Sequence, residues 1–469
     1  MYSITNEIMY NNVDAYVFLF CDDFEENIKQ LENKFNKKKS LGLNNYFNDE
    51  TKKVLKIVKD NKIFFIAKVS DSGCSKRDLD DIIYKVMTMV KNEKKIKKIQ
   101  ILPAPIKKLI EFQILKFVYY IYEYEKYKTK KLNQLNKVYF CVDNKLNNLV
   151  KTGIVKAEIL NNSRDMVNEP PNKMTAQKFL NDVRKTMSKK IKLRIYDEAA
   201  LKKEKMNLIL SVNSGSKNKP YLLVLSYLPL KRQDPAVLVG KGVTFDAGGI
   251  NLKFGSFHDM KTDMTGASVV FSVINLIAKM KVKKNVIALI PLVENMIGQN
   301  AARPGDVIVS HSKKTVEITN TDAEGRLIMA DCLSFCKKFN PSYIIDVATL
   351  TGSVGRMFDN MSTAMMGNNN KMQSLFEKTS DDFNELVWKL PLWKEYNDHL
   401  KSKVADLKNS NDRGGQTMVA GSFLSNFVPK DTKWMHLDIA GVSYFENSPK
   451  YKGATAASIH PIYDFIKRY

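Results

Sequence analysis

Apolar and polar positions alternate differently in the first third of the chain and in the rest. In residues 1–150 short apolar runs predict strands, and lysine-studded patterns with helical spacing lie between them. The predicted strands are Ala15–Phe20, Lys62–Val69 and Val138–Val142, and the predicted helices are Leu79–Lys91 and Ile106–Tyr124. This alternation predicts a small N-terminal α/β domain.

Beyond residue 173 the strand-like segments become continuous apolar runs, which is typical of strands buried on both faces. These runs are Tyr221–Leu228, Ala236–Gly240, Val286–Val293 and Tyr343–Val347. Helical patterns lie between them at Thr265–Met280 and Leu327–Lys338. Residues 174–469 are therefore predicted to form a doubly wound, mainly parallel sheet with helices on both faces. Pro170 and Pro171 stop any helix before them, so residues 151–173 are predicted to be a linker.

Composition fits two globular domains, because 44% of the 469 residues are hydrophobic. The net charge of +24 suggests nucleic-acid binding, but the basic excess is spread evenly. Residues 1–150 hold 28 Lys/Arg and 19 Asp/Glu, and residues 151–469 hold 46 and 31. A general lysine bias therefore explains the charge better than a dedicated basic patch does.

Cysteine usage indicates a reducing compartment, because the five cysteines are few, odd in number and scattered. They are Cys21, Cys74, Cys141, Cys332 and Cys336. The chain shows no signal-peptide pattern and no apolar run long enough to cross a bilayer. The expectation is a soluble cytoplasmic protein without a membrane partner.

Acidic residues cluster where the predicted strands end, and ligands gather at such edges in α/β folds. Asp246 follows the strand Ala236–Gly240, while Asp322 and Glu324 follow a predicted strand at Thr315–Thr319. Asp263 lies in a third segment. Four carboxylates at one site cannot all stay ionised without cations between them. Any one of these aspartates alone is more simply a helix cap or turn residue, but together they predict a site for two divalent metal ions.

Two lysines flank the glycine-rich turn that contains Asp246. Lys241 and Lys253 have three possible roles: a metal ligand when deprotonated, a cation that polarises a carbonyl oxygen, or an ordinary surface charge. The guanidinium of Arg326 suits a small planar anion.

Other hydrolase classes lack their signatures in this chain. There is no Gly-x-Ser-x-Gly turn and no His-Glu-x-x-His helix. None of the histidines lies beside a plausible nucleophile; they are His258, His311, His399, His436 and His460. This excludes a serine or cysteine hydrolase and a one-zinc protease of that type.

Several segments resemble the leucyl (cytosol) aminopeptidase family of dinuclear metallo-exopeptidases. The most specific is Asn320-Thr-Asp-Ala-Glu-Gly-Arg-Leu327. The other matching segments are Gly240–Gly249, Met260–Ala267, Asp346–Gly352, Ser402–Lys408, His436–Gly441, Lys452–Thr455 and, as the family's linker, Ser163–Asn168. The resemblance runs from about residue 160 to the end, and residues 1–150 match the family only in size and position.

The resemblance implies an enzyme that releases N-terminal amino acids, Leu or Met by preference, from peptides with a free N-terminus. It implies two divalent ions per subunit (Zn or Mn, with Mg or Co as alternatives), a bound bicarbonate and a homohexamer. It also implies an N-terminal α/β domain with an assembly or regulatory role, followed by the catalytic domain.

The family's site residues carry over one by one. One ion would bind Asp246, Asp322 and Glu324; the other would bind Lys241, Asp246, Asp263 and Glu324. A hydroxide bridging both ions would attack the peptide carbonyl, Lys253 would stabilise the oxyanion, and Arg326 would hold bicarbonate as the general base. The remaining matched positions line the substrate and bicarbonate sites, and they are Met260, Ala323, Gly325, Thr349, Leu350 and Gly352.

The alternative is a nucleic-acid-binding hexameric homologue in which peptidase activity is secondary, a side role known in some members of the family. The +24 charge motivates it, but the complete ligand set argues that the chemistry is retained. Specific nucleic-acid binding is not expected. Gel shifts with metal-free protein would discriminate, because absence of binding at low salt removes this alternative.

Overall fold

The computed structural model describes residues 1–9, 12–20, 54–59, 61–69, 75–130, 135–255, 257–411, 413–446, 448, 450 and 452–469. The chain divides into two compact units, Met1–Asn161 and Asn162–Tyr469. The division falls inside helix α4 (Asn147–Asn168), and the helix ends just before Pro170 and Pro171.

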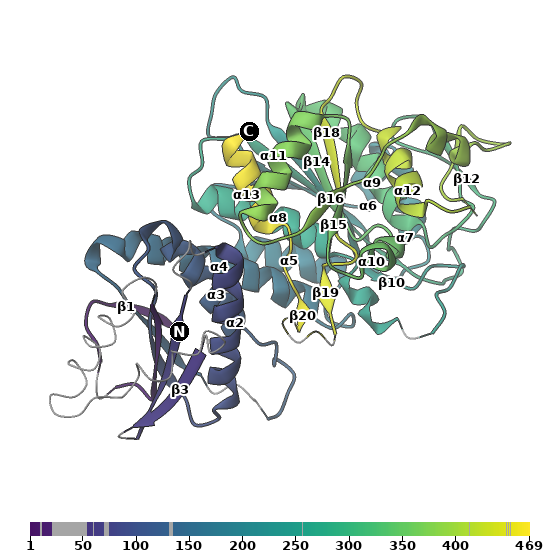
Figure 1. Ribbon diagram of the computed structural model, residues 1–469. Helices are drawn as coiled ribbons and strands as arrows, with labels where there is room; N and C mark the ends of the chain where they lie inside the picture. Colours follow the sequence, from purple (N-terminus) through teal and green to yellow (C-terminus); the bar gives the residue numbers. More distant parts are fainter. Residues whose placement is uncertain are drawn as a thin grey trace. The chain divides into compact units, whose positions relative to one another are not determined.

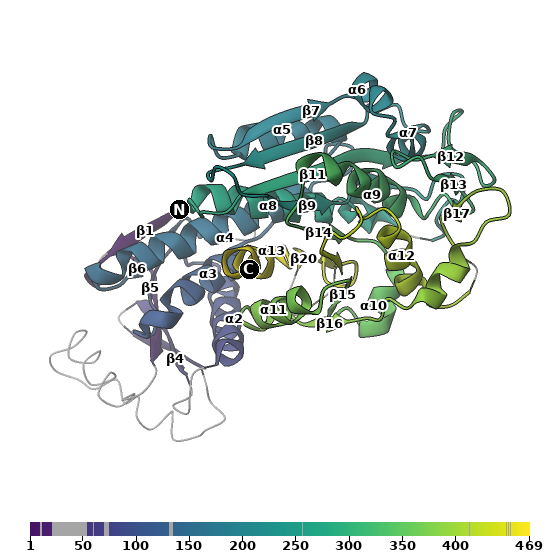
Figure 2. The same cartoon turned by 90° about the horizontal axis from the view of Figure 1, so that it is seen from above.

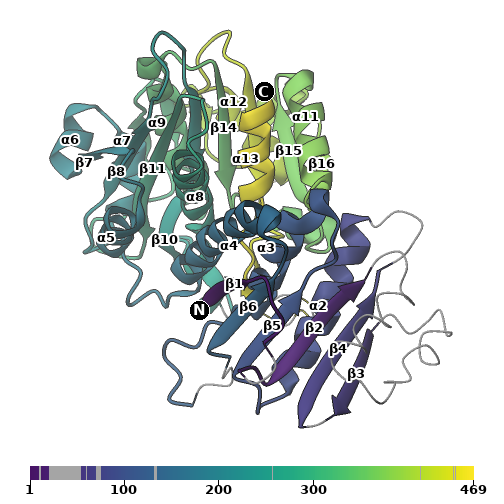
Figure 3. The same cartoon turned by 90° about the vertical axis from the view of Figure 1, so that its left-hand side faces the viewer.

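The first unit is built on a six-stranded sheet in the order β1-β6-β5-β2-β4-β3, which Figure 3 shows. Its strands are β1 (Tyr2–Thr5), β2 (Ala15–Phe20), β3 (Val54–Lys59), β4 (Lys62–Lys68), β5 (Lys98–Leu102) and β6 (Lys137–Cys141). All pairs are parallel except β3–β4. Helices α2 (Lys76–Asn92) and α3 (Ile110–Ile121) pack against each other, and short 3-10 turns lie at Lys107–Leu109 and Asn144–Leu146.

The second unit is built on a nine-stranded sheet in the order β16-β15-β18-β14-β9-β11-β8-β7, with β10 also paired to β11. Figure 2 shows β7, β8, β11, β9 and β14 following one another across it. The bounds are β7 (Lys192–Tyr196), β8 (Tyr221–Tyr227), β9 (Ala236–Gly240), β10 (Gly242–Asp246), β11 (Val286–Asn295), β14 (Tyr343–Ala348), β15 (Thr363–Gly367), β16 (Val387–Lys389) and β18 (Trp434–Asp438). The pairs β7–β8, β8–β11 and β15–β18 are antiparallel, and the others are parallel.

Helices cover both faces of this sheet (Figure 1). On one face α8 packs on β9, β11 and β14, with α5 on β8 and with α13 and α11 beyond α8. On the other face α9 packs on β9 and β11 beside α7 and α12. The helices are α5 (Ala176–Thr186), α6 (Glu198–Lys203), α7 (Asn207–Asn213), α8 (Thr265–Lys279), α9 (Glu324–Phe335), α10 (Gly352–Phe358), α11 (Asn370–Asp381), α12 (Gln416–Ser425) and α13 (Ile459–Arg468).

Smaller elements complete the second unit and support its loops. Strands β12 (Val307–Val309), β13 (Thr315–Glu317) and β17 (Leu407–Lys408) form a small sheet, and β19 (Tyr444–Phe445) pairs with β20 (Gly453–Ala454). Turns of 3-10 helix lie at η4 (His258–Thr262), Cys336–Phe339 and Lys394–Leu400.

The apolar runs explain why the central strands form where they do. Every residue of β9, β11 and β14 is buried, because both faces of these strands are covered by helices. The α/β fold with a mainly parallel, doubly covered sheet is therefore confirmed. The helix predicted at Leu327–Lys338 begins three residues earlier, at Glu324, so this acid belongs to the first turn of α9.

Two further sequence observations can be placed. Cys141, Cys332 and Cys336 are free thiols, and Cys21 and Cys74 lie outside the described residues. No helix among the described residues combines the length and the apolar character needed to cross a bilayer.

Candidate metal centre

Four acidic residues meet at the carboxyl edge of the large sheet, each placed by a different local element. Asp246 ends β10, and Asp322 lies in the turn after β13. Glu324 is the first residue of α9, and Asp263 follows the 3-10 turn η4. Single oxygen atoms of Asp246, Asp322 and Glu324 lie within 4.8 Å of one another.

Two lysines pair with these carboxylates. Lys241 Nζ lies 2.6 Å from Asp263 Oδ1 and 2.8 Å from Glu324 Oε1. Lys253 Nζ lies 2.8 Å from Asp246 Oδ2 and also contacts Asp322 Oδ1. The structure thus brings together all five residues that the sequence assigns to metal binding, with Lys253 among them.

The two lysines differ in how far solvent reaches them. The side chain of Lys241 is 3% exposed, and its ammonium group also donates to the Thr349 carbonyl oxygen at 2.9 Å. The side chain of Lys253 is 20% exposed. Lys253 therefore lies on the accessible side of the cluster, where a bound molecule can reach its Nζ, whereas Lys241 lies behind the carboxylates.

The excess of carboxylates over lysines shows in the electrostatics of the cluster. Burial, reinforced by the charge of Glu324, raises the pKa of Asp246 to about 7. Burial also raises the pKa values of Asp263 and Asp322. Burial opposes ionisation of Glu324 as well, but Lys241 and Lys253 outweigh it and lower the pKa of Glu324. The cluster therefore carries more negative charge than its own lysines balance, which favours added cations.

Burial would lower the pKa of Lys241, but Asp263, Glu324 and Asp246 together raise it above its ordinary value. This lysine is thus an ammonium ion in the structure as it stands. A lysine ligates a metal only as the neutral amine, so binding at this position requires that the proton leave.

The donor set fits hard divalent ions or zinc, both of which accept carboxylate oxygens. Asp263 Oδ2 is buried without a hydrogen-bond partner among the described residues, so this oxygen remains available as a ligand. The other oxygen of Asp263 accepts from Lys241 Nζ and, at 2.8 Å, from Thr349 Oγ1. These contacts fix the direction of the free oxygen.

Gly325 is required by the packing of Lys241. A Cβ atom at position 325 would lie 2.3 Å from Cε of Lys241 and 2.7 Å from its Nζ. The lysine reaches Glu324 and Asp263 across the bare backbone of this residue. Any side chain here would push the ammonium group out of the cluster.

Arg326 is buried one turn into α9, and burial lowers its pKa to about 10, so it stays charged at neutral pH. Its Nη1 donates to the Asn409 carbonyl oxygen at 2.7 Å, and Nε has no hydrogen-bond partner among the described residues. The guanidinium therefore has donor capacity left for an anion.

The remaining predicted positions lie around the cluster with different degrees of support. Ala323 is buried at the start of α9. Met260 accepts a backbone hydrogen bond from Asp263, and Gly352 is the exposed first residue of α10. The N–H of Leu350 already donates to Asp438 Oδ1 at 3.1 Å, so a contact from Leu350 to an anion would have to displace Asp438.

Sequence reasoning missed the amides that hold the acidic segments together. Asn295 Nδ2 donates to Asp246 Oδ1 at 2.8 Å and to the Thr321 carbonyl oxygen at 3.0 Å. Its place at the end of the apolar run of β11 is the same strand-end signal that singled out Asp246. Asn409 also contacts the acidic loop, but an asparagine in a loop carries no comparable sequence signal.

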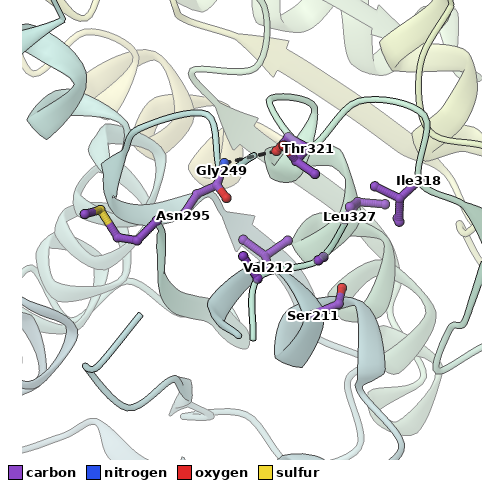
Figure 4. Close-up of a pocket in the computed structure, with 10 residues that line it drawn as sticks. Ser211, Val212, Gly249, Asn295, Ile318, Thr321 and Leu327 are labelled. Carbon is purple, nitrogen blue, oxygen red and sulfur yellow. Dashed lines mark hydrogen bonds between the residues drawn. The ribbon is translucent and has the colours of Figure 1, made fainter. Parts of the chain in front are cut away.

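A cavity of about 10 Å³ lies behind the acidic loops, enough for about one water molecule. Figure 4 shows Asn295 and Thr321, joined by their hydrogen bond, among the residues that line it. None of the carboxylates lines this cavity, so it belongs to the support of the site rather than to ligand binding.

The fold and the cluster together define an α/β protein with a carboxylate- and lysine-rich centre at the ends of its strands. Residues 161–463 match the model of the cytosol aminopeptidase family, catalytic domain. The chain belongs to this family, as the octapeptide at Asn320–Leu327 had indicated.

Individual proteins give the same picture. A probable cytosol aminopeptidase of Geobacter sp. (strain M21) is 40% identical over 311 residues, 65% of this chain and 63% of that protein. One of Fusobacterium nucleatum is 37% identical over 354 residues, 74% of this chain and 73% of that protein. The match thus spans about three fifths of the Geobacter relative. The bottromycin maturation enzyme BotP, solved in complex with Mn, shares the fold over 97% of this chain and 99% of its own, with a TM-score of 0.85 and 24% identity.

Proposed function

We propose that this chain is a metal-dependent aminopeptidase that removes N-terminal residues, Leu or Met by preference, from peptides. The observation that carries the proposal is the meeting of Asp246, Asp322 and Glu324 within 4.8 Å, with Asp263 and two lysines beside them. The family's name and the names of the relatives supply the reaction class.

Asp246, Asp322 and Glu324 would hold one divalent ion. Lys241, Asp246, Asp263 and Glu324 would hold the second, so that Asp246 and Glu324 serve both. Zn or Mn is the proposed pair, with Mg or Co as alternatives. When bound, such ions lower the pKa of water to near neutrality and polarise a carbonyl oxygen.

The chain's own residues then supply position and charge. Lys253, the more accessible lysine, would donate to the oxyanion that develops on the peptide carbonyl. Arg326 would hold a bicarbonate ion as the general base with its unused donors. The free α-amino group of the substrate would be recognised at the cluster, which explains why only N-terminal residues would be released.

Metal removal tests this function directly. Protein stripped with a chelator is expected to hydrolyse aminoacyl-amide reporters at the background rate, because its carboxylates alone cannot activate water. Reloading with Zn, Mn, Mg or Co, one ion at a time, is expected to restore turnover, fastest with leucyl or methionyl reporters. Full activity in the stripped protein, verified metal-free by elemental analysis, would contradict the proposal.

We also propose the family's homohexamer for this chain. The expected particle has six times the chain mass of 53.6 kDa, and light scattering after size-exclusion chromatography measures it. A monomeric mass would contradict this part of the proposal and leave the chemistry of the site untouched.

A further inference from the structure

Asn409 is completely buried and lies directly after β17, some 90 positions along the chain from the acidic loop that it touches. Its strand runs parallel to β13, with Glu317 opposite Lys408. This pairing delivers the side chain of Asn409 to residues 319–323, which join β13 to α9.

Every hydrogen bond of the Asn409 carboxamide is made with this segment. Oδ1 accepts from the Thr319 N–H at 2.9 Å, from Thr319 Oγ1 at 3.3 Å and from the Asn320 N–H at 3.2 Å. Nδ2 donates to the carbonyl oxygens of Asn320 at 2.7 Å and Ala323 at 3.4 Å. One side chain thus satisfies backbone groups at both ends of a five-residue turn.

The turn passes this order on to the acids. Asn320, held by Asn409, uses its own Oδ1 to accept from the Asp322 N–H at 2.8 Å. Ala323 immediately precedes Glu324, the residue with which α9 begins. The two acids therefore inherit their directions from a backbone that Asn409 fixes.

The main chain of Asn409 acts on a third functional group. Its carbonyl oxygen accepts from Arg326 Nη1 at 2.7 Å. Asn409 therefore contacts or orients the surroundings of Asp322, Glu324 and Arg326, although it contacts none of the carboxylates itself.

We propose that Asn409 is a positioning residue, which holds residues 319–323 so that Asp322 and Glu324 converge on the metal ions and Arg326 faces the site. This rests on the proposed function. Buried asparagines also serve simply to satisfy turns, and a residue with that role alone would affect the unfolding temperature and leave metal affinity unchanged. The two roles are therefore separable by experiment.

The experiment compares metal binding and catalysis in Asn409→Ala, Asn409→Asp and a control. Aspartate has the same size and keeps the acceptor, but it has no N–H to donate and directs an oxygen at the carbonyls of Asn320 and Ala323. The control is Asn411→Ala: Asn411 is also a buried amide, two positions along, but it donates to the Arg413 carbonyl oxygen at 2.9 Å and lies 3.2 Å from His399 Nδ1.

Metal-free full-length proteins are titrated with Co²⁺, followed by visible absorption, and with Mn²⁺, followed by calorimetry. Because partners of metal ligands typically change metal affinity or activity by about 10–100-fold, both Asn409 variants are expected to bind at least one ion about 10-fold or more weakly. Their kcat is expected to fall more than KM rises, and Asn411→Ala is expected to stay within about 2-fold of the parent protein, below that range.

Unchanged metal affinity in folded Asn409 variants would overturn the proposal, and so would an equal loss in Asn411→Ala. If neither Asn409 variant accumulates as folded protein while Asn411→Ala does, Asn409 is a folding determinant and the proposal also fails. Failure of the parent protein to bind metal or hydrolyse a reporter would instead refute the proposed function, so the two failures are distinguishable.

Discussion

Replacing Glu324 by alanine is expected to lower kcat/KM by more than about 100-fold, because substitutions of residues that only support metal ligands already cost about 10–100-fold. Glu324 is 2% exposed, and it is the carboxylate proposed to bind both ions. Calorimetric titration of the metal-free variant is expected to show the loss of at least one metal site.

The fold of this variant is expected to survive, because Lys241 keeps its contact with Asp263 at 2.6 Å when Glu324 is removed. Asp331→Asn is the matched control. Asp331 is a fully buried carboxylate on the same helix, but it accepts from the backbone N–H groups of Leu208, Ile209 and His311. The control is expected to change the unfolding temperature while metal stoichiometry stays the same. Substantial turnover by folded Glu324→Ala would refute the shared-ligand role.

The second large effect is expected at Lys253. Lys253→Ala should lower kcat by about 100- to 1000-fold with a smaller change in KM, the pattern of a lost oxyanion contact. The partial exposure of Lys253 and its place beside Asp246 and Asp322 put its charge where a substrate carbonyl can meet it. Steady-state kinetics on a leucyl reporter, with saturating metal, measure both constants.

Loss of one positive charge needs its own control in this assay. Lys314→Ala removes the same charge from a lysine that donates to the Asn426 carbonyl oxygen at 2.8 Å, outside the acidic cluster. It is expected to leave kcat unaltered. A Lys253 variant with the parent kcat, or an equal fall in the Lys314 variant, would remove the oxyanion assignment.

The sequence revealed the buried sheet because burial on both faces leaves a simple pattern of continuous apolar residues. The strand Ala236–Gly240 was predicted with the bounds of β9, and Tyr343–Val347 with all but one residue of β14. The direction of neighbouring strands leaves no such pattern. The apolar run of β8 resembles that of β9, yet β8 lies antiparallel to β11 and β9 lies parallel to it.

The acidic residues could be found from the sequence because they follow predicted strands. The partners of those acids depend on which loops meet in space. Nothing in the sequence near Asn409 connects it with Thr319 and Asn320, since the contact exists only because β17 pairs with β13. The pairing of Lys253 with Asp322 likewise depends on how two separate turns fold back on each other.

The bare backbone at Gly325 also constrains how this protein can change over evolutionary time. Even one extra methyl group there would act as a wedge between α9 and the lysine stem lying against it, with 2.3 Å where an ordinary carbon–carbon contact needs more than 3 Å. Homologues that retain the lysine should therefore be invariant at this position, and any lineage that drifts to alanine should have abandoned the chemistry first.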